Sequence, residues 1–140
     1  MYFKGVSMFK AHGDWRYFVE PPVIYVEISG CFNKEAVASF SIEIAQEIIK
    51  YPEHSIQYAV VNLEQFELAT ADSIEIAKVY FQAVKARGYK RVDYIKANII
   101  ARNLLETIWS GVEMDINFHP DAKSFFQARP EYDNLRKWLK

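Results

Sequence analysis

The chain has 140 residues and a mass of 16.4 kDa, which is enough for one domain with a hydrophobic core of ordinary size. Hydrophobic residues make up 51% and charged residues 25%, a balance that excludes a disordered chain. The formal net charge of −1 gives no global attraction to nucleic acid or to an anionic membrane, and the single cysteine, Cys31, excludes an internal disulfide.

The N-terminal residues have no apolar core of the length that a signal peptide needs. No apolar run in the chain approaches the roughly 20 residues that span a bilayer. We therefore expect a cytoplasmic protein without an integral membrane segment.

Three strands are predicted near the N-terminus, at residues 6–11, 15–20 and 23–29. Pro21-Pro22 separates the second from the third, because proline cannot donate a ladder hydrogen bond. We expect these strands to pair antiparallel. Side chains alternate along the third strand, so one of its faces is expected in the core; the two sets are Val23, Tyr25 and Glu27, and Ile24, Val26 and Ile28.

After Gly30, which is expected to end the third strand, helices and strands alternate. Asn33 and Asp72 are suitable N-caps for two of the helices. The predicted elements are helices at 34–50, 72–87, 99–109 and from Pro120 onward, the last bent or restarted by Pro130, and strands at 56–63, 91–98 and 114–118. This order predicts one α/β domain, residues 1–140, with a mixed sheet, an antiparallel N-terminal hairpin and about four helices.

The sequence carries no constellation that is typical of an enzyme. The histidines lack metal-ligand spacing, and no glycine-rich phosphate loop or G-x-S-x-G elbow is present. Cys31 precedes a helix, where a thiolate is favoured, but a small half-buried apolar residue is the simpler interpretation. We expect no catalytic residue, no metal and no cofactor. The densest basic run fits a solvated helix end, so we expect no nucleic acid; it contains Lys85, Arg87, Lys90 and Arg91.

Acidic and hydroxyl side chains gather where the strand at 56–63 leads into the helix at 72–87. Asp72 can cap this helix by accepting its first free amide hydrogens, and the glutamates can simply face solvent. The alternative is a binding surface at the helix entrance, where the hydroxyl groups are also conceivable sites of phosphorylation. The candidate interaction loop and helix entrance consists of Glu67, Thr70, Ala71, Asp72, Ser73 and Glu75.

Two further features leave alternatives open. Aromatic residues make up 16% of the chain and can either fill the core, which we favour, or line an apolar pocket formed by Trp15, Phe18, Phe81 and Trp109. An apolar stripe in residues 130–140 can pack on the domain, which is the simpler arrangement, or be buried in a homodimer; it consists of Tyr132, Leu135, Trp138 and Leu139.

Several segments resemble STAS domains, which include the bacterial anti-sigma-factor antagonists of the SpoIIAA type. Residues 61–64 and 70–74 resemble the family's strand and helix entrance, and 98–105 resembles a later helix. The resemblance covers residues 15–126, so the strand at 6–11 and the helical extension at 130–140 are expected as additions. It implies a SpoIIAA-like mixed sheet and a cytoplasmic, non-enzymatic regulatory or protein-interaction module.

In the antagonists the helix entrance is Asp-Ser-Ser-Gly, and its first serine is phosphorylated. The corresponding residues here are Thr70, Ala71, Asp72 and Ser73, so the phosphoacceptor position holds Ala71, which has no hydroxyl. We therefore expect the fold without the serine phosphorylation switch. The partner is expected to be a protein of unknown identity. The alternative is a small apolar ligand or lipid, by analogy with the broadly similar CRAL-TRIO domains.

Overall fold

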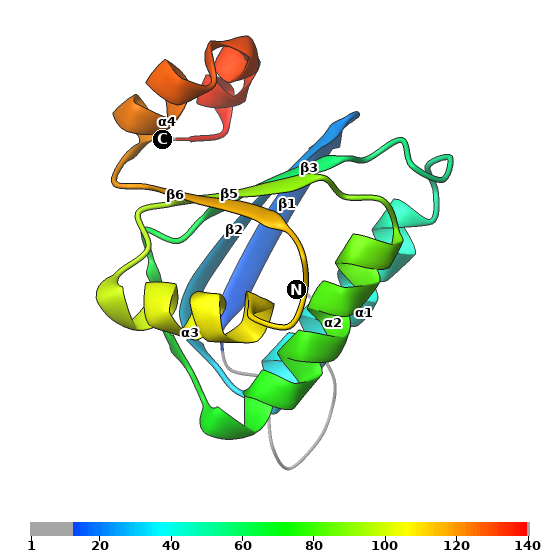
Figure 1. The fold of residues 1–140 in the computed structure, drawn as a ribbon, viewed down its shortest axis with the longest axis vertical. Coiled ribbons are helices and arrows are strands. Elements are labelled where there is room, and N and C mark those ends of the chain that lie inside the picture. The colour runs from blue at the N-terminus through cyan, green and yellow to red at the C-terminus, as the bar shows by residue number, and fades with distance from the viewer. Residues whose placement is uncertain (1–12, 140) are drawn as a thin grey trace.

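The computed structural model describes residues 13–139 and contains one mixed six-stranded sheet. Five strands follow the order β1-β2-β3-β5-β6, and β4 pairs with the end of β2 (Figure 1). Only the β1–β2 hairpin is antiparallel. The strands are β1 (Asp14–Glu20), β2 (Val23–Phe32), β3 (Tyr58–Asn62), β4 (Phe66–Ala69), β5 (Arg91–Ile95) and β6 (Asp115–His119). The predicted α/β fold class with an antiparallel hairpin is confirmed, whereas the predicted strand at 6–11 lies outside the described residues.

Within residues 13–139, four α-helices and two short 3₁₀ segments complete the fold. They are α1 (Lys34–Ile48), η1 (Ala71–Ser73), α2 (Ile74–Ala86), α3 (Ile99–Trp109), α4 (Ala122–Ala128) and η2 (Pro130–Lys137). Three of the helices begin at a side-chain cap: the side-chain oxygens of Asn33, Asn98 and Asp121 each accept a hydrogen bond from the backbone amide three residues on. The predicted cap at Asn33 and the predicted helix at 99–109 are confirmed.

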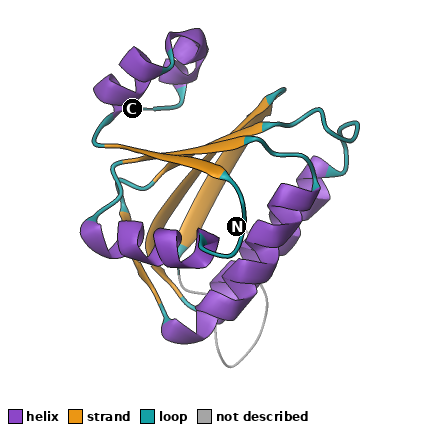
Figure 2. Ribbon diagram, viewed as in Figure 1, coloured by secondary structure: helices purple, strands orange, loops and turns teal. Residues whose placement is uncertain are grey.

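The first face of the sheet is covered by α1, α2 and α3, which connect successive parallel strands (Figure 2). Ile24 and Val26 of β2 belong to this core, together with Ile44 and Ile48 of α1. Their spacing explains both elements, because every second residue of a strand and every fourth residue of a helix lie on one face.

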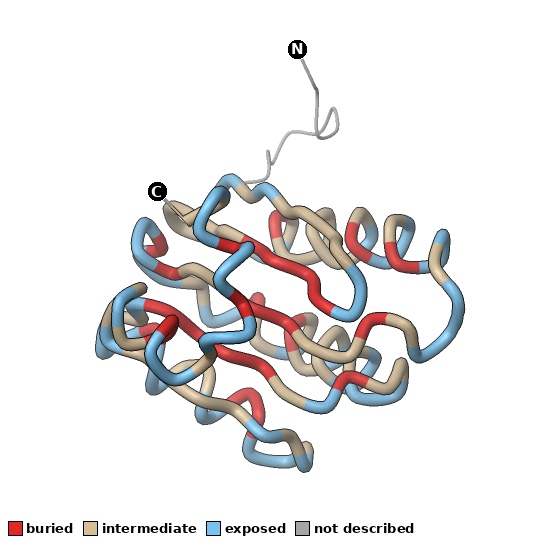
Figure 3. Tube along the Cα trace, turned by 90° about the horizontal axis from the view of Figure 1, so that it is seen from above, coloured by how far each residue is buried: buried red, intermediate tan, exposed pale blue. Residues whose placement is uncertain are grey.

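The second face of the sheet is covered by α4 and η2. Val23 and Tyr25 of β2 pack there against Phe125 and Leu135, so β2 is buried on both faces rather than on the one that we expected. Buried residues accordingly run along the middle of the sheet (Figure 3). The predicted C-terminal stripe packs on its own domain, and Leu135 has no exposed surface.

We expected Gly30 to end β2, but the strand continues through this residue and has an irregularity there. The backbone at Gly30 has φ +80°, which favours glycine, and the pairing register with β4 shifts between Gly30 and Cys31. Cys31 and Phe32 then continue the strand by pairing with Leu68 and Ala69. The segment that we expected to be an acidic loop is therefore partly a strand, β4, whose four residues were too few to give a clear alternation.

Candidate functional site

The entrance of α2 is held by backbone hydrogen bonds from two sides. The amide of Gly30 donates to the carbonyl of Gln65 at 2.9 Å, and the amide of Thr70 donates to the carbonyl of Phe32 at 2.8 Å. Both bonds tie the segment between β3 and α2 to the end of β2. The residues that follow, Ala71 to Ser73, form the 3₁₀ turn η1 that leads directly into α2.

Asp72 does not cap α2, which corrects our expectation. No side-chain cap is formed at either Thr70 or Ser73, the residues that precede η1 and α2. The Asp72 carboxylate instead accepts a hydrogen bond from the Thr70 hydroxyl at 2.5 Å. The turn places Asp72 within η1 rather than before the helix, so its carboxylate points back to Thr70.

The predicted interaction residues differ in exposure. Ala71 and Asp72 are exposed, whereas Ser73 is buried and donates its hydroxyl hydrogen to the Thr70 carbonyl at 2.6 Å. Exposed Glu75 pairs with Lys78 at 3.5 Å. The Ser73 hydroxyl is thus a structural group of the turn, and the accessible part of the entrance carries Ala71, Asp72 and Glu75.

Glu67 lies on β4, next to the sole cysteine. The Cys31 thiol donates to a Glu67 carboxylate oxygen at 3.6 Å, and partial burial together with this carboxylate raises the pKa of the thiol. Burial and the Glu67 carboxylate therefore disfavour the thiolate form of Cys31, whereas the nearby start of α1 alone would favour it. Cys31 is half-buried, as the simpler interpretation expects.

Apolar side chains that we did not predict as part of the site lie beside this entrance. Leu68, Ile99 and Ile100 are exposed, and 74% of the Ile99 surface is accessible. The Asn98 side-chain amide donates to the carbonyls of Phe66 and Glu67 at 3.0 and 3.3 Å, which fixes the start of α3 beside β4. In the sequence, the signal for this apolar surface was the pair Ile99 and Ile100, which follows the helix cap Asn98 immediately.

The four aromatic residues predicted to line one pocket do not converge. Trp15, Phe81 and Trp109 belong to the core beneath α1–α3, whereas Phe18 lies on the other face and stacks on Trp138 at 5.0 Å. Phe81 and Trp109 do border an internal apolar cavity, but its volume is about 110 Å³. Ligand pockets usually measure about 300–1,000 Å³, so these rings mainly fill the core.

A buried carboxylate forms a cluster that the sequence patterns did not reveal. Asp93 on β5 is completely buried, and its two oxygens contact His119 at 2.8 Å, Arg129 at 3.2 Å and Arg91 at 3.2 Å. Arg91 also donates to the Tyr132 hydroxyl at 2.7 Å. The cluster therefore fastens the segment from Arg129 to Tyr132 to the sheet.

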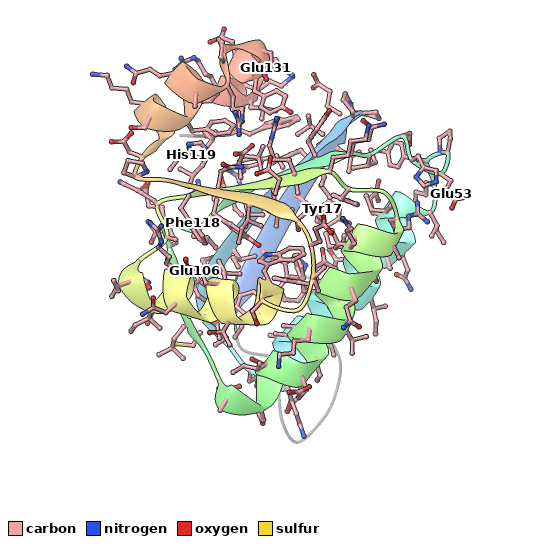
Figure 4. All side chains as sticks on the ribbon, viewed as in Figure 1. Tyr17, Glu53, Glu106, Phe118, His119 and Glu131 are labelled. Atoms are coloured by element: carbon pink, nitrogen blue, oxygen red, sulfur yellow. The ribbon has the colours of Figure 1, made fainter. Side chains whose placement is uncertain are left out.

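Successive residues of β6 show how this cluster is separated from the aromatic core. Figure 4 labels Phe118 and His119 on opposite sides of the strand. Phe118 stacks on Tyr94 beneath the helices, whereas His119 contacts Phe125 of α4. A charged residue at position 93, between the apolar residues Val92 and Tyr94 of β5, was the sequence signal for the cluster.

Within residues 13–139, no three histidine, cysteine, aspartate or glutamate side chains gather as metal ligands would. In the same part of the chain, no helix is long and apolar enough to cross a membrane. The Asp93 carboxylate is occupied by its contacts with Arg91, His119 and Arg129. The surface around the α2 entrance, in contrast, combines accessible acidic side chains with accessible apolar ones.

The strand order, the antiparallel hairpin and the covering helices define a SpoIIAA-like fold. The anti-sigma factor antagonist SpoIIAA in its unphosphorylated form has a TM-score of 0.59 at 12% identity, covering 84% of this chain and 97% of that one. An uncharacterised Shewanella loihica protein with a SpoIIAA-like fold gives 0.61 at 11% identity, covering 86% and 98%. An anti-sigma factor antagonist from Mycobacterium paratuberculosis gives 0.56 at 14% identity, covering 84% and 93%.

These similarities confirm the predicted resemblance to SpoIIAA-like STAS domains at the level of the fold. No protein-family model and no curated protein sequence matches the chain. At 11–14% identity the relationship does not carry ligands or partners from one protein to another.

Proposed function

We propose that this protein is a non-enzymatic regulatory module that binds a protein partner through the surface around the α2 entrance. The observation that carries the proposal is the exposed apolar group Leu68, Ile99 and Ile100 beside the exposed Asp72 and Glu75. An apolar centre bordered by charged residues is the usual composition of a protein-binding surface.

The rigidity of this surface supports the proposal. Asn98 joins α3 to β4, and the Thr70 amide joins η1 to β2, so the elements that present the apolar and acidic groups are fastened to one another. A pre-organised surface loses less conformational entropy when it binds than a mobile loop does.

Binding here is proposed to be constitutive rather than switched by phosphate. Ala71 is exposed at the position that corresponds to the phosphorylated serine, and it has no hydroxyl. The Ser73 hydroxyl is buried and engaged with the Thr70 carbonyl. Asp72 contributes a fixed charge of −1, which is smaller than the charge of a phosphate group.

The test uses the full chain as bait in extract from its own source, with captured proteins identified by mass spectrometry and binding then measured with the purified partner. The variant Asp72→Lys/Glu75→Lys inverts the charge of the proposed surface. The matched control, Glu53→Lys/Glu106→Lys, makes the same change at exposed positions elsewhere, which Figure 4 labels.

We expect the Asp72→Lys/Glu75→Lys variant to weaken binding at least 10-fold and the control to bind as the wild type does. Equal binding by the wild type and the Asp72→Lys/Glu75→Lys variant would refute this assignment of the surface. Intact-mass measurement of the purified chain is expected to show no added phosphate.

A further inference from the structure

A second apolar surface lies on the outer side of the pair α1 and α2, away from the α2 entrance. A groove of about 540 Å³ runs between the two helices and is lined almost entirely by apolar side chains. Its outer edges are formed by Ile42 on α1, by Ile49 at the C-terminal cap of that helix and by Val79 on α2, which are 59%, 68% and 67% exposed. We name this surface the α1–α2 face.

The residues of the α1–α2 face follow helical spacing. Small and large residues alternate along the stripe on α1, and a similar stripe follows α2; the two stripes are Ala38, Ile42, Ala45 and Ile49, and Ile76, Val79 and Ala83. Positions three or four residues apart lie on the same side of a helix, so each stripe is continuous.

These stripes are additional to those that build the core. Helix α1 already buries Ala36, Ile44 and Ile48 against the sheet, and α2 buries Ala77. The outward isoleucines and Val79 contribute little to that core because most of their surface remains accessible. A helix that is apolar on two sides normally has a packing partner on each of them.

We propose that the α1–α2 face binds the same face of a second copy of this chain. Fifteen residues of α1 span about 22 Å, and two adjacent helices are roughly 20 Å wide with their side chains, so the face covers on the order of 400 Å² in projection. This is smaller than the ~800 Å² per partner that a stable interface buries, so the contact is expected to form at high protein concentration. The occupant that fits is therefore another flat helical pair.

The shape of the face suits contact with itself. The projecting side chains of Ile42 and Ile49 alternate with the small residues Ala38 and Ala45, so that ridges and hollows occur on the same surface. A two-fold dimer requires this self-complementarity, because each patch meets its own copy. Knobs on one helix can then fill holes on the other.

Charge favours an antiparallel arrangement. Both helices run in the same direction in one molecule (Figure 1), so a two-fold axis across them sets each helix antiparallel to its own copy. Glu75, in the first turn of α2, then lies opposite the end of α2 in the second copy, where Arg87 borders the groove. Helix dipoles also favour antiparallel neighbours.

The polar surroundings of the face suit another copy better than a lipid surface. Exposed Gln46 and Gln82, near the middle of the two helices, are uncharged, and the partly exposed Lys78 is paired with Glu75 at 3.5 Å. A helix that lies on an anionic membrane normally carries lysine and arginine beside its apolar side. The net charge of −1 also causes little repulsion between two copies.

Sedimentation of the full chain over a concentration series tests the proposal. We expect the wild type to approach twice the 16.4 kDa chain mass and the variant Ile42→Glu/Val79→Glu to remain at one chain mass, because four carboxylates would be buried between the copies. The matched control, Ile99→Glu/Ile100→Glu, changes two exposed isoleucines of α3 and is expected to dimerise normally. Circular dichroism verifies that each variant is folded.

A crosslinking measurement addresses the arrangement and does not depend on the folding of the glutamate variant. Val79 lies near the middle of α2, so Val79→Cys in a Cys31→Ser background is expected to give a covalent dimer on oxidation. Ile99→Cys in the same background is expected to stay uncrosslinked.

The proposal is overturned if the wild type stays monomeric at high concentration, if the α1–α2 variant still dimerises, or if the Val79→Cys variant gives no covalent dimer. Native mass spectrometry adds one more contrary result: a monomer that loses a small apolar molecule on denaturation would assign the groove to that ligand. This interface and the proposed partner surface share Glu75 on α2, so variants that leave Glu75 intact separate them. Ile42→Glu/Val79→Glu is expected to lose the dimer and keep the partner, whereas Asp72→Lys alone is expected to weaken partner binding and keep the dimer.

Discussion

The two faces of the central sheet are stabilised in different ways. Beneath α1–α3, a continuous series of ring contacts joins Trp15, Phe40, Tyr80, Phe81 and Trp109, with centroids 4.5–5.7 Å apart. Beneath α4 and η2, aromatic rings are combined with a completely buried carboxylate and the arginine and histidine side chains that contact it. One face thus depends mainly on apolar burial, and the other also depends on a charge cluster.

This difference affects how each face tolerates change. Apolar side chains can adjust to a neighbour of similar volume at modest cost, because their contacts are not directional. A buried charge cluster requires every member, since removal of one partner leaves the others desolvated without compensation. The face covered by the C-terminal segment is therefore expected to be the more sensitive to a single polar substitution.

The largest expected effect is that of Asp93→Ala. The substitution leaves Arg91, His119 and Arg129 around a buried site without their shared carboxylate, and we expect the free energy of unfolding to fall by about 3–5 kcal/mol. Urea unfolding followed by circular dichroism measures the change. Asp115→Ala, at an exposed position on the neighbouring strand, is the control and should stay within about 0.5 kcal/mol of the wild type. A loss below about 1 kcal/mol for Asp93→Ala would contradict the contrast between the faces.

A smaller effect is expected from the buried polar contact between Trp109 and Tyr94, which lies beneath the helices. Trp109 Nε1 donates to the Tyr94 hydroxyl at 2.8 Å, and Trp109→Phe leaves that hydroxyl without this donor at a cost of about 1–3 kcal/mol. Adding Tyr94→Phe removes the unpaired hydroxyl, so the double variant should lose less stability than the sum of the two single variants. Simple additivity in urea unfolding would count against this contact.

The smallest effect concerns Glu27, which lies on the face covered by the C-terminal segment. The Arg16 guanidinium bonded to it lowers the pKa of this carboxyl below its ordinary value of 4.5. A lowered folded-state pKa contributes stability above the ordinary value, and that contribution is lost as the pH falls through the folded-state pKa. Below about pH 4.5, the wild type should therefore lose stability more steeply than Glu27→Gln.

Urea unfolding at a series of pH values measures the two slopes. Glu106→Gln, on exposed α3, provides the control and should keep the slope of the wild type. Equal slopes for Glu27→Gln and the wild type would show that the bond to Arg16 does not govern acid stability.

The helix-covered face could be predicted from the sequence because its signals are local. Asn98 marks the start of α3, and the alternation of Ile24 and Val26 marks the inner side of β2. The order of strands and helices followed from such signals, as did the resemblance to STAS domains. The short strand β4 was missed because its pairing with β2 depends on a shift at Gly30 that no periodicity reveals.

The second face and much of the site depend on contacts between distant residues. Asp93, His119 and Arg129 are separated by up to 36 positions, and each alone resembles an ordinary polar residue. Ile99 and Ile100 become part of a surface with β4 only through the Asn98 side chain. The α2 entrance could be located from its acidic residues, but the direction of the Asp72 carboxylate could not.

The second face of the sheet is covered by α4 and η2, which come last in the sequence, and this order matters while the chain is being synthesised. Tyr25, in the second strand, is buried by contacts that include Trp138, more than one hundred residues later. During translation, this side of β2 therefore stays open to water until nearly all of the described chain has emerged from the ribosome. The nascent protein exposes an aromatic strand throughout that interval, and such transiently exposed apolar surface promotes aggregation before folding is complete.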